Sequence, residues 1–396
     1  LSPSDDNLSQ KVVLAQAWKK SHEYIRSTNW YADTFELDRS AINLESLLDD
    51  WIAEIKNENF AFGALKLIPA PKTDRWGFVP LKSSEFVVGP GPNKFGLSDY
   101  EQFSNLSHVW VPDEADDSKL KPLRPLAHVS IRDQTIMTAL MMCLAEGIET
   151  AQGDTSIAFQ HVHEKGICSY GNRLYCHYED GVAAFNWGNS ISYSKYFADY
   201  RQFLDRPAYF GFEALQSKSE NEYVYEVHLD IEKFFDKTQR SLLTESIRRF
   251  LSEKDQIPLN ILRAFENWQW ADGTNEVFRE ICTNQDLNEA PLGIPQGLVA
   301  GGFLSNVYLL EFDEWLLGKC DNFISENVRL VDYCRYVDDI RLILVSSEDR
   351  KSVSERLYSI LEPKLALLDL SINHDKTKIE IFRSKRPGIS FKLKEI

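Results

Sequence analysis

Residues 328–345 read VRLVDYCRYVDDIRLILV, and this stretch decides the fold. Val328–Tyr336 and Ile340–Val345 are apolar runs of strand length, and the short break between them carries Asp338 and Asp339. Two such runs around a tight polar break are typical of a β-hairpin. The pattern therefore predicts two buried antiparallel strands with adjacent carboxylates at the hairpin tip.

A third strand is predicted upstream, over Tyr223–Asp230. Its residues alternate, so that one face is apolar and the other ends in Asp230. A glycine-rich turn follows at Gly293–Gly302, and the apolar spacing within Phe303–Trp315 predicts a helix. Helical spacing also predicts helices within residues 1–58 and over 131–149, whereas residues 150–222 are expected to be irregular.

Carboxylates that converge from separate strands are the ligands that two-metal phosphoryl transfer needs. Taken singly, such carboxylates are more often turn formers or helix N-caps. Adjacent Asp338 and Asp339 are harder to explain in that way, because like charges between apolar strands repel unless a cation is present. Together with Asp230, they are the candidate metal ligands.

Composition describes an ordinary globular protein with a large core, since 43% of the 396 residues are hydrophobic and 12% aromatic. No uninterrupted apolar run is long enough for a membrane span, and no signal segment follows Leu1, so a cytoplasmic protein is expected. The net charge of −16 opposes a protein whose whole surface binds nucleic acid. It leaves room for a local basic channel, such as Lys376–Lys394.

The six cysteines show no C-x-x-C spacing, and several lie in apolar runs. This distribution favours free thiols over structural zinc or a disulfide framework. His161 and His163 invite a metal interpretation, but a pair of surface loop residues is the favoured one.

The motifs resemble those of reverse transcriptases, and they occur in the order of that family. Tyr336–Asp339 is similar to the Y-x-D-D hairpin of these enzymes. The other matching segments are His228–Asp236 (the preceding palm strand), Gly293–Gly297 (the Pro-Gln-Gly loop), Asn306–Leu309, Arg124–Asp133 and Ser169–Arg173 (two fingers motifs), and Asn373–Lys378 (the lysine motif after the hairpin). Each motif alone is a weak signal, but the ordered set is specific. It resembles group II intron, retron and abortive-infection enzymes more than retroviral ones.

The resemblance implies that Asp230, Asp338 and Asp339 hold two Mg²⁺ ions, with the Ile231 carbonyl as a supporting ligand. It also implies that Lys376 donates a proton to pyrophosphate or steadies it. The alternative for Lys376 is a solvated surface lysine.

The resemblance also implies a nucleotide site. Phe235 would be a steric gate under the sugar of the incoming nucleotide, or else a core aromatic beside Phe234. Gln296 and Gly297 would line the site, where glycine permits close backbone approach, or else form a plain strand-to-helix turn. Arg124 would contact the triphosphate, for which its planar fork of donors is suited, or else make a surface salt bridge.

The fold implied is α+β, with the fingers and palm of a right-hand polymerase. It has an antiparallel palm sheet with helices on one face, a helical N-terminal extension, and a thumb that is missing or lies beyond the chain end. The expected domains are the extension (1–59), fingers with insertions (60–215), palm (216–238), connecting helices of fingers and palm (239–290), palm (291–385) and the start of a primer grip or thumb (386–396). One departure from the family is a stretch of about fifty residues between the second fingers motif and the strand of Asp230.

The expected activity is addition of deoxynucleotides to a 3′-hydroxyl. The insertions and the acidic balance resemble bacterial defence-associated enzymes, which implies a role against phage. The implied partners are dNTP and nucleic acid (an RNA template, a DNA primer or both, a noncoding RNA among them), with a homo-oligomer or partner protein as a further option and no membrane. The alternatives are a retron-type enzyme, an RNA-dependent RNA polymerase, and an inactive palm that serves as a nucleic-acid-binding scaffold. The aromatic Phe235 opposes the RNA polymerase, because those enzymes typically place an aspartate near that position.

Overall fold

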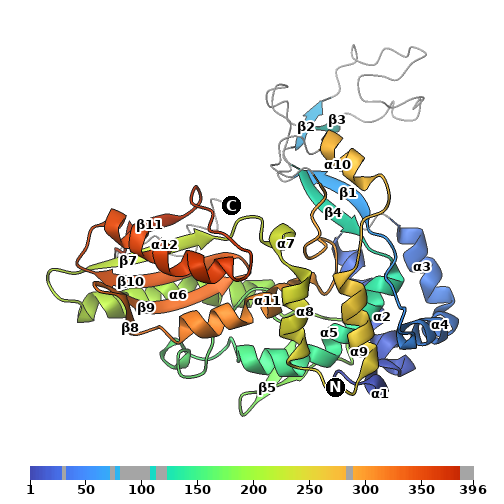
Figure 1. Ribbon diagram of the computed structural model, residues 1–396. Coiled ribbons are helices and arrows are strands. Elements are labelled where there is room, and N and C mark those ends of the chain that lie inside the picture. Colours follow the sequence, from blue (N-terminus) through green and yellow to red (C-terminus); the bar gives the residue numbers. More distant parts are fainter. Residues whose placement is uncertain (29–32, 72–75, 81–107, 113–122, 282–288, 384–396) are drawn as a thin grey trace. The chain divides into compact units, whose positions relative to one another are not determined.

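The computed structural model describes residues 1–28, 33–71, 76–80, 108–112, 123–281 and 289–383 (Figure 1). These residues belong to two compact units. The larger unit comprises the described residues of 1–67, 127–272 and 291–396, and the smaller comprises those of 68–126 and 273–290.

A five-stranded antiparallel sheet with the order β11-β7-β10-β9-β8 lies in the larger unit. Its strands are β7 (Tyr223–Asp230), β8 (Asn322–Ser325), β9 (Val328–Tyr336), β10 (Asp339–Ser346) and β11 (Lys378–Ile381). Strands β7 and β9 have the bounds that the sequence predicted. Asp339 pairs with Tyr336, so a loop of two residues, Val337 and Asp338, closes the predicted hairpin.

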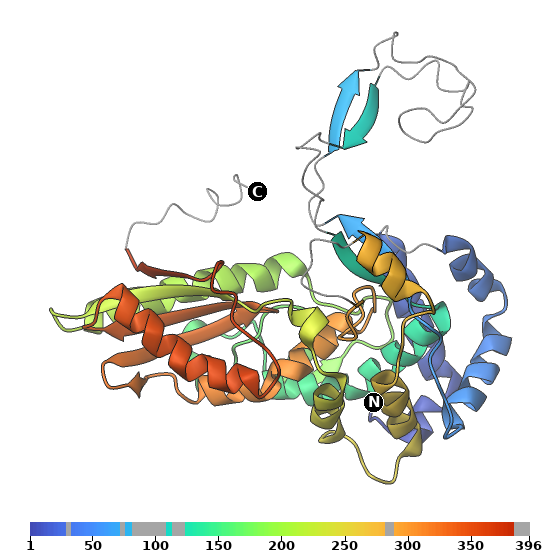
Figure 2. The same ribbon diagram turned by 45° about the horizontal axis from the view of Figure 1, so that its top comes forward.

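Helices cover both faces of this sheet (Figures 1 and 2). On one face, α11 (Gly301–Leu317) and α12 (Arg350–Ala366) share a core with Val227. On the opposite face, α6 (Tyr196–Ser217) shares a second core with Ile343. The α+β class with an antiparallel palm sheet is confirmed, but helices were expected on one face only, and α6 covers the other face as well.

Helix α6 corrects the expectation that residues 150–222 are irregular. Its buried side carries Phe203, Phe210 and Ala214, whose spacing is helical. Pro207 also lies inside the helix, on the same buried side. A proline within an apolar pattern ordinarily marks a helix end, so it concealed a helix that packing against the sheet stabilises.

The rest of the larger unit is mainly helical. Helices α1 to α4 lie where helical spacing predicted them, and α5, almost entirely buried, packs against α2. These and the remaining elements are α1 (Asp5–Leu8), α2 (Lys11–Thr28), α3 (Thr34–Ile42), α4 (Leu44–Lys56), α5 (Ile131–Gln152), a 3₁₀ turn (Phe159–His161), β5 (Cys176–Glu179), β6 (Val182–Phe185), α7 (Phe234–Lys237), α8 (Arg240–Arg248) and α9 (Gln256–Glu266). None of the described helices is both long and apolar enough to span a membrane.

Helix α2 buries the whole side chain of Lys20. Its Nζ donates to the carbonyl oxygens of Asn186 (3.0 Å) and Ile191 (2.7 Å) and to Oδ1 of Asn189 (3.3 Å). Loss of solvent lowers the pKa of Lys20 to about 8. This lysine thus attaches the N-terminal helices to the loop after β6.

The described residues of the smaller unit form two pairs of strands and one helix. Strand β1 (Lys66–Pro71) pairs with β4 (Leu123–His128), and β2 (Trp76–Pro80) pairs with β3 (His108–Pro112). The helix is α10 (Thr274–Ile281). Strand β1 begins in the larger unit, and strand β4 ends in it. The chain therefore passes from one unit to the other within these two strands.

Candidate active site

Asp230 and Asp339 are brought together by strand register. Strands β7 and β10 pair antiparallel, and these two residues are direct partners at the end of the ladder. Residues directly opposite each other point to the same face, with Cβ atoms roughly 4.5–5.5 Å apart. Asp338 precedes Asp339 in the hairpin loop, so three carboxylates gather at one end of the sheet.

The hairpin tip has an unusual backbone conformation. Val337 has φ 58°, a value that is uncommon for a β-branched residue and that favours glycine in such two-residue loops. A Cβ on Gly171 would lie 2.6 Å from Val337 N and 2.7 Å from Val337 Cγ2, so the backbone at Gly171 presses against the tip. Backbone conformations of this kind persist where the surroundings impose them.

A buried polar network holds the strand that leads to the tip. Arg335 is fully buried, and it donates from Nε and Nη2 to the two carboxylate oxygens of Asp313 at 2.7 and 2.6 Å. Its Nη1 donates to Asn306 Oδ1 (2.9 Å) and to the carbonyl of Val337 (3.3 Å). Asn306 Nδ2 in turn donates to the carbonyl of Gly171 (2.8 Å). One guanidinium therefore connects α11, β9, the tip and the second fingers motif.

The electrostatics of the three carboxylates favour a cation. Desolvation raises the pKa of Asp338 to about 6, and the charges of Asp339 and Asp230 act in the same direction. Partial desolvation also raises the pKa of Asp339, which the Arg341 guanidinium partly offsets. Burial and neighbouring negative charges both disfavour the ionised form of a carboxyl group, and a nearby positive charge favours it. A bound divalent ion would supply that charge.

Asp230 has two further partners from the segment after α12. Lys376 Nζ lies 3.1 Å from Asp230 Oδ2, and Asn373 Nδ2 donates to the same oxygen at 3.1 Å. The Asn373 backbone N–H donates to the Asp230 carbonyl (2.8 Å), and Ile231 forms an isolated bridge with Ile372. The structure thus places the predicted Lys376 and Ile231 beside the carboxylates.

The structure brings together three residues that were predicted to form the nucleotide site, Phe235, Gln296 and Gly297. Phe235 is half-buried, and the side chain of the next residue, Asp236, accepts a hydrogen bond from Gln296 Nε2 (2.8 Å). Gly297 has φ 126°, and a Cβ there would lie 2.4 Å from the Ala127 carbonyl oxygen. Glycine is therefore required at this position for packing, whatever else it does.

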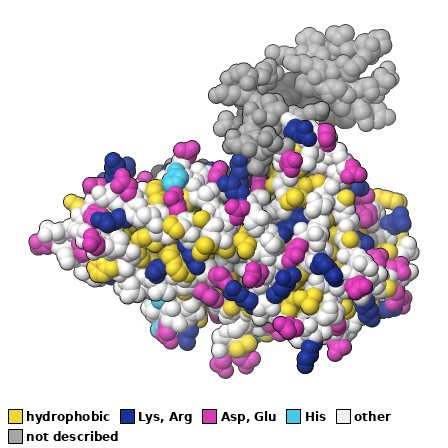
Figure 3. Space-filling view, viewed as in Figure 1, with side chains coloured by type: hydrophobic (Ala, Val, Ile, Leu, Met, Phe, Trp, Pro, Cys, Tyr) yellow, Lys and Arg dark blue, Asp and Glu magenta, His cyan; other side chains and the backbone are white. Residues whose placement is uncertain are grey.

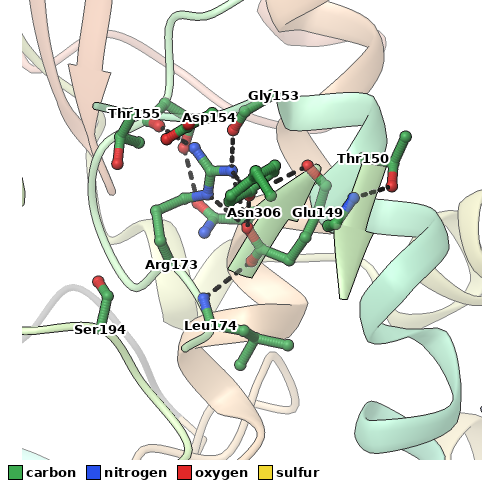
Figure 4. Close-up of polar contacts among 12 residues, drawn as sticks. Glu149, Thr150, Gly153, Asp154, Thr155, Arg173, Leu174, Ser194 and Asn306 are labelled. Carbon is green, nitrogen blue, oxygen red and sulfur yellow. Dashed lines mark hydrogen bonds and ion pairs between the residues drawn. The ribbon is translucent and has the colours of Figure 1, made fainter. Parts of the chain in front are cut away.

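Two arginines of the fingers motifs have different surroundings. Arg173 is buried and donates to Glu149 Oε2 (2.8 Å), the Ser169 carbonyl (2.8 Å) and Tyr178 Oη (2.9 Å), which makes it an anchor of the second fingers motif (Figure 4). Arg124 lies on β4 in the smaller unit with an exposed side chain. Its contact with triphosphate stays a prediction.

The hard oxygen ligands at the sheet end are of the type that Mg²⁺ prefers. Within the described part of the chain, however, the group of three candidate ligands whose ligand atoms all lie within 4.8 Å of one another is His163, Cys320 and Asp332. That group is a packing cluster. Arg206 already donates to both carboxylate oxygens of Asp332, and His163 is half-buried and stacked on Phe210 rather than a surface loop residue. The three aspartates do not form a group of this kind within the described residues, and a two-ion site distributes its carboxylates over two centres.

Three supporting residues escaped the sequence reasoning. Asp313 sits in an apolar helix and gave no sign of its partner on β9, which is far away in sequence. The need for glycine at position 171 depends on a backbone contact that no local pattern encodes. Asn373 lies in the segment Asn373–Lys378, for which the family resemblance implies a role of Lys376 alone.

Acidic and basic side chains are interspersed over the face shown in Figure 3. Over the whole chain, acidic residues outnumber basic ones by 60 to 44. A nucleic-acid-binding surface of this chain would therefore be local, because a strongly acidic protein repels phosphates at long range.

Comparison with known proteins identifies the class. Residues 189–391 match the profile of the family described as reverse transcriptase (RNA-dependent DNA polymerase). This match includes the sheet, its three carboxylates and the helices on both faces. Since it covers just over half of the chain, the protein belongs to the reverse transcriptase family.

Individual relatives are more distant. Protein YkfC of Escherichia coli (strain K12) is 29% identical over 174 residues, which cover 38% of this chain and 42% of YkfC. The chain thus spans less than half the length of this curated relative. Among solved structures, telomerase from Candida tropicalis aligns in its apo form (TM-score 0.32, 15% identity, 46% of this chain and 33% of that one). A form truncated from the C-terminal domain aligns as well (TM-score 0.28, 17% identity, 47% and 36%).

Proposed function

We propose that this chain adds deoxynucleotides to a 3′-hydroxyl by a two-metal mechanism, with Asp230, Asp338 and Asp339 as the ligands of two Mg²⁺ ions. The observation that carries the proposal is the direct pairing of Asp230 with Asp339 across β7 and β10. Membership of a family of RNA-dependent DNA polymerases supports the same chemistry.

The proposed ions would activate the attacking hydroxyl and neutralise the leaving pyrophosphate. The protein's part is to hold the carboxylates in place and to supply the Ile231 carbonyl as a further oxygen ligand. Lys376 touches Asp230 at 3.1 Å with a largely exposed side chain, so its Nζ is free to turn toward pyrophosphate once a cation replaces it at the carboxylate. There it would donate a proton to the leaving group or balance its charge.

Nucleotide selection is assigned to four residues in this proposal. Phe235 would exclude a 2′-hydroxyl by steric contact, Gln296 and Gly297 would line the site, and Arg124 would hold the triphosphate. The half-buried ring of Phe235 and the hydrogen bond from Gln296 to Asp236 support a preformed pocket wall on this side.

The biological role belongs to the same proposal. The long segment before β7, which folds into β5, β6 and α6, and the acidic composition favour a bacterial defence-associated enzyme acting in the cytoplasm against phage. Its partners would be dNTP, an RNA template or DNA primer, and a second copy or another protein. The proposed domains are the extension (1–59), the fingers (60–215), the palm (216–238 and 291–385) and the connecting helices (239–290). The proposed primer grip at 386–396 lies outside the described residues.

The test is incorporation of labelled nucleotide by the full chain, with and without Mg²⁺, on an RNA template, a DNA template and no template. Mg²⁺-dependent incorporation of dNTP but not NTP is expected. Equal use of NTP would indicate an RNA polymerase, and no incorporation together with retained nucleic-acid binding would indicate an inactive scaffold. A co-purifying branched RNA–DNA hybrid would favour a retron-type enzyme over a defence enzyme of the abortive-infection type.

A further inference from the structure

Helix α6 begins with exposed aromatic side chains. Tyr196 is 52% exposed and Phe197 is 79% exposed. The Tyr196 ring stacks on that of Tyr200 (centroids 5.1 Å apart, planes at 15°), and both rings meet Tyr336 of the hairpin edge-on, at 5.8 and 5.2 Å. These four residues are called the aromatic patch below.

The aromatic patch adjoins the catalytic hairpin. Tyr336 pairs directly with Asp339 and is followed by Val337 and Asp338. Desolvation raises the pKa of the Tyr196 hydroxyl, and the neighbouring Tyr200 and the charge of Asp339 act in the same direction. Under the proposed function, a strand whose 3′-hydroxyl reaches the carboxylates therefore brings its last bases close to the aromatic patch.

Buried contacts fix the aromatic patch in place. Asp199, in the first turn of α6, accepts hydrogen bonds from Ser194 and from Thr155 Oγ1 (2.9 Å). Two turns further on, Arg206 is fully buried and donates from Nη2 to Asp332 of β9 at 2.7 Å. A rigid surface loses little conformational freedom when it binds a ligand, so the aromatic patch is preorganised.

The sequence around the aromatic patch interleaves rings with cations. Lys195 and Arg201 flank the two exposed aromatic residues, and both of these basic side chains are exposed. Aromatic rings that stack on bases, with cations beside them for the phosphates, are the usual means of binding single-stranded nucleic acid. Packing in the core accounts for the aromatic side chain of Phe203. It does not account for that of Phe197, which is exposed to solvent.

We infer that the aromatic patch binds the unpaired 3′-terminal bases of the strand that the enzyme extends, with Phe197 and Tyr196 as stacking surfaces. The inference rests on the proposed polymerase function for the place of the 3′ end, while the binding itself needs neither metal nor nucleotide. The patch holds a primer end that is not covered by a duplex. The enzyme is thereby suited to extend single-stranded ends.

The test measures binding of a single-stranded DNA of about 12 nucleotides by fluorescence anisotropy, in EDTA and without nucleotide. The DNA carries 2-aminopurine at its 3′ end, because the fluorescence of this base falls when it stacks. Wild type is compared with Tyr196→Ala/Phe197→Ala and with Tyr196→Phe. Phe323→Ala is the matched control, since Phe323 is 65% exposed on β8 and pairs near the opposite end of β9 from Tyr336.

Wild type, Tyr196→Phe and Phe323→Ala are expected to bind alike and to quench the 3′-terminal base. The double alanine variant should bind about tenfold more weakly or worse and should not quench it, with an unchanged dependence on salt. Equal binding and quenching by the double variant would overturn the inference. A wild type that shows patch-dependent quenching but incorporates no nucleotide with Mg²⁺ would instead refute the proposed polymerase function and leave the binding site standing.

Discussion

Asp230 and Asp339 face each other across the last rung of the β7–β10 ladder, although they come from distant parts of the chain. Neither strand could place both carboxylates alone. Because the side chains of paired residues point to the same face, a shift of one residue in register would turn one carboxylate away. The proposed metal site therefore depends on the pairing of these two strands.

Replacing a carboxylate should remove activity and metal binding together. Asp230→Asn and Asp338→Asn are expected to lower incorporation by about a thousandfold or more, since hard oxygen ligands for the ions are lost. Mg²⁺ should raise the melting temperature of the wild type but not that of either variant, and EDTA should reverse the rise. Without metal, Asp338→Asn should melt no lower than the wild type, because it loses a charge that Asp339 and Asp230 repel. Glu380→Gln, on the exposed part of β11, is the control and should behave as the wild type.

The contact between Gly171 and the hairpin tip predicts a second effect. Gly171→Ala places a methyl group 2.6 Å from a backbone nitrogen of Val337, so the tip must move. We expect kcat to fall about tenfold or more with an unchanged circular dichroism spectrum. Gly188→Ala is the control, since a Cβ added at position 188 would have no other atom within 4 Å. Equal rates for the two variants would show that the tip tolerates displacement.

The Arg335–Asp313 pair predicts a loss of stability. Asp313→Ala leaves a fully buried guanidinium without its carboxylate, and breaking such a pair costs about 3–5 kcal/mol. Denaturant titration of Asp313→Ala should show this loss. The exposed pair Lys351–Glu355 serves for comparison, since Glu355→Ala should change the free energy of unfolding by about 0.5 kcal/mol or less.

The ring of Phe235 predicts the sugar selectivity. Phe235→Val should admit NTP, with the preference for dNTP over NTP falling about 100-fold, while use of dNTP falls only modestly. Phe235→Tyr keeps the ring and should keep the preference. The measurement is a side-by-side comparison of kcat/KM for dNTP and NTP at equal Mg²⁺. An unchanged preference for dNTP over NTP in the valine variant would show that Phe235 is a core aromatic residue and not a steric gate.

Lys20 predicts a dependence of stability on pH. Its folded pKa of about 8 lies below its ordinary value of 10.5, because burial disfavours the charged amine. The folded protein is therefore most stable, relative to the unfolded chain, above the unfolded pKa of Lys20. This stability is lost as the pH falls through about 8. The free energy of unfolding of the wild type should rise relative to Lys20→Met between neutral pH and pH values near 10. Urea titrations at both pH values would check this, and a constant difference would contradict it.

Local patterns could predict much of the sheet, because alternation and apolar runs are properties of neighbouring residues. Strands β7 and β9 and helix α5 were predictable for that reason. Pro207 concealed α6, and only packing on the sheet reveals why the helix continues through it. The contact of Gly171 with Val337 and the pairing of Arg335 with Asp313 join different elements, so the pattern within one strand or helix does not reveal them.

The pairing of β7 with β10 also has a consequence for how the protein forms. About 110 residues are synthesised between Asp230 and Asp339, so the central ladder closes a long loop and is expected to form slowly. Until β10 emerges from the ribosome, β7 lacks both of its neighbours, β10 and β11, and exposes unpaired, largely apolar edges, which makes nascent chains prone to aggregation. Truncated products that end before β10 cannot complete the carboxylate cluster. Under the proposed function, a cell that makes this chain would therefore acquire nucleotide-adding capacity only after translation has passed the hairpin.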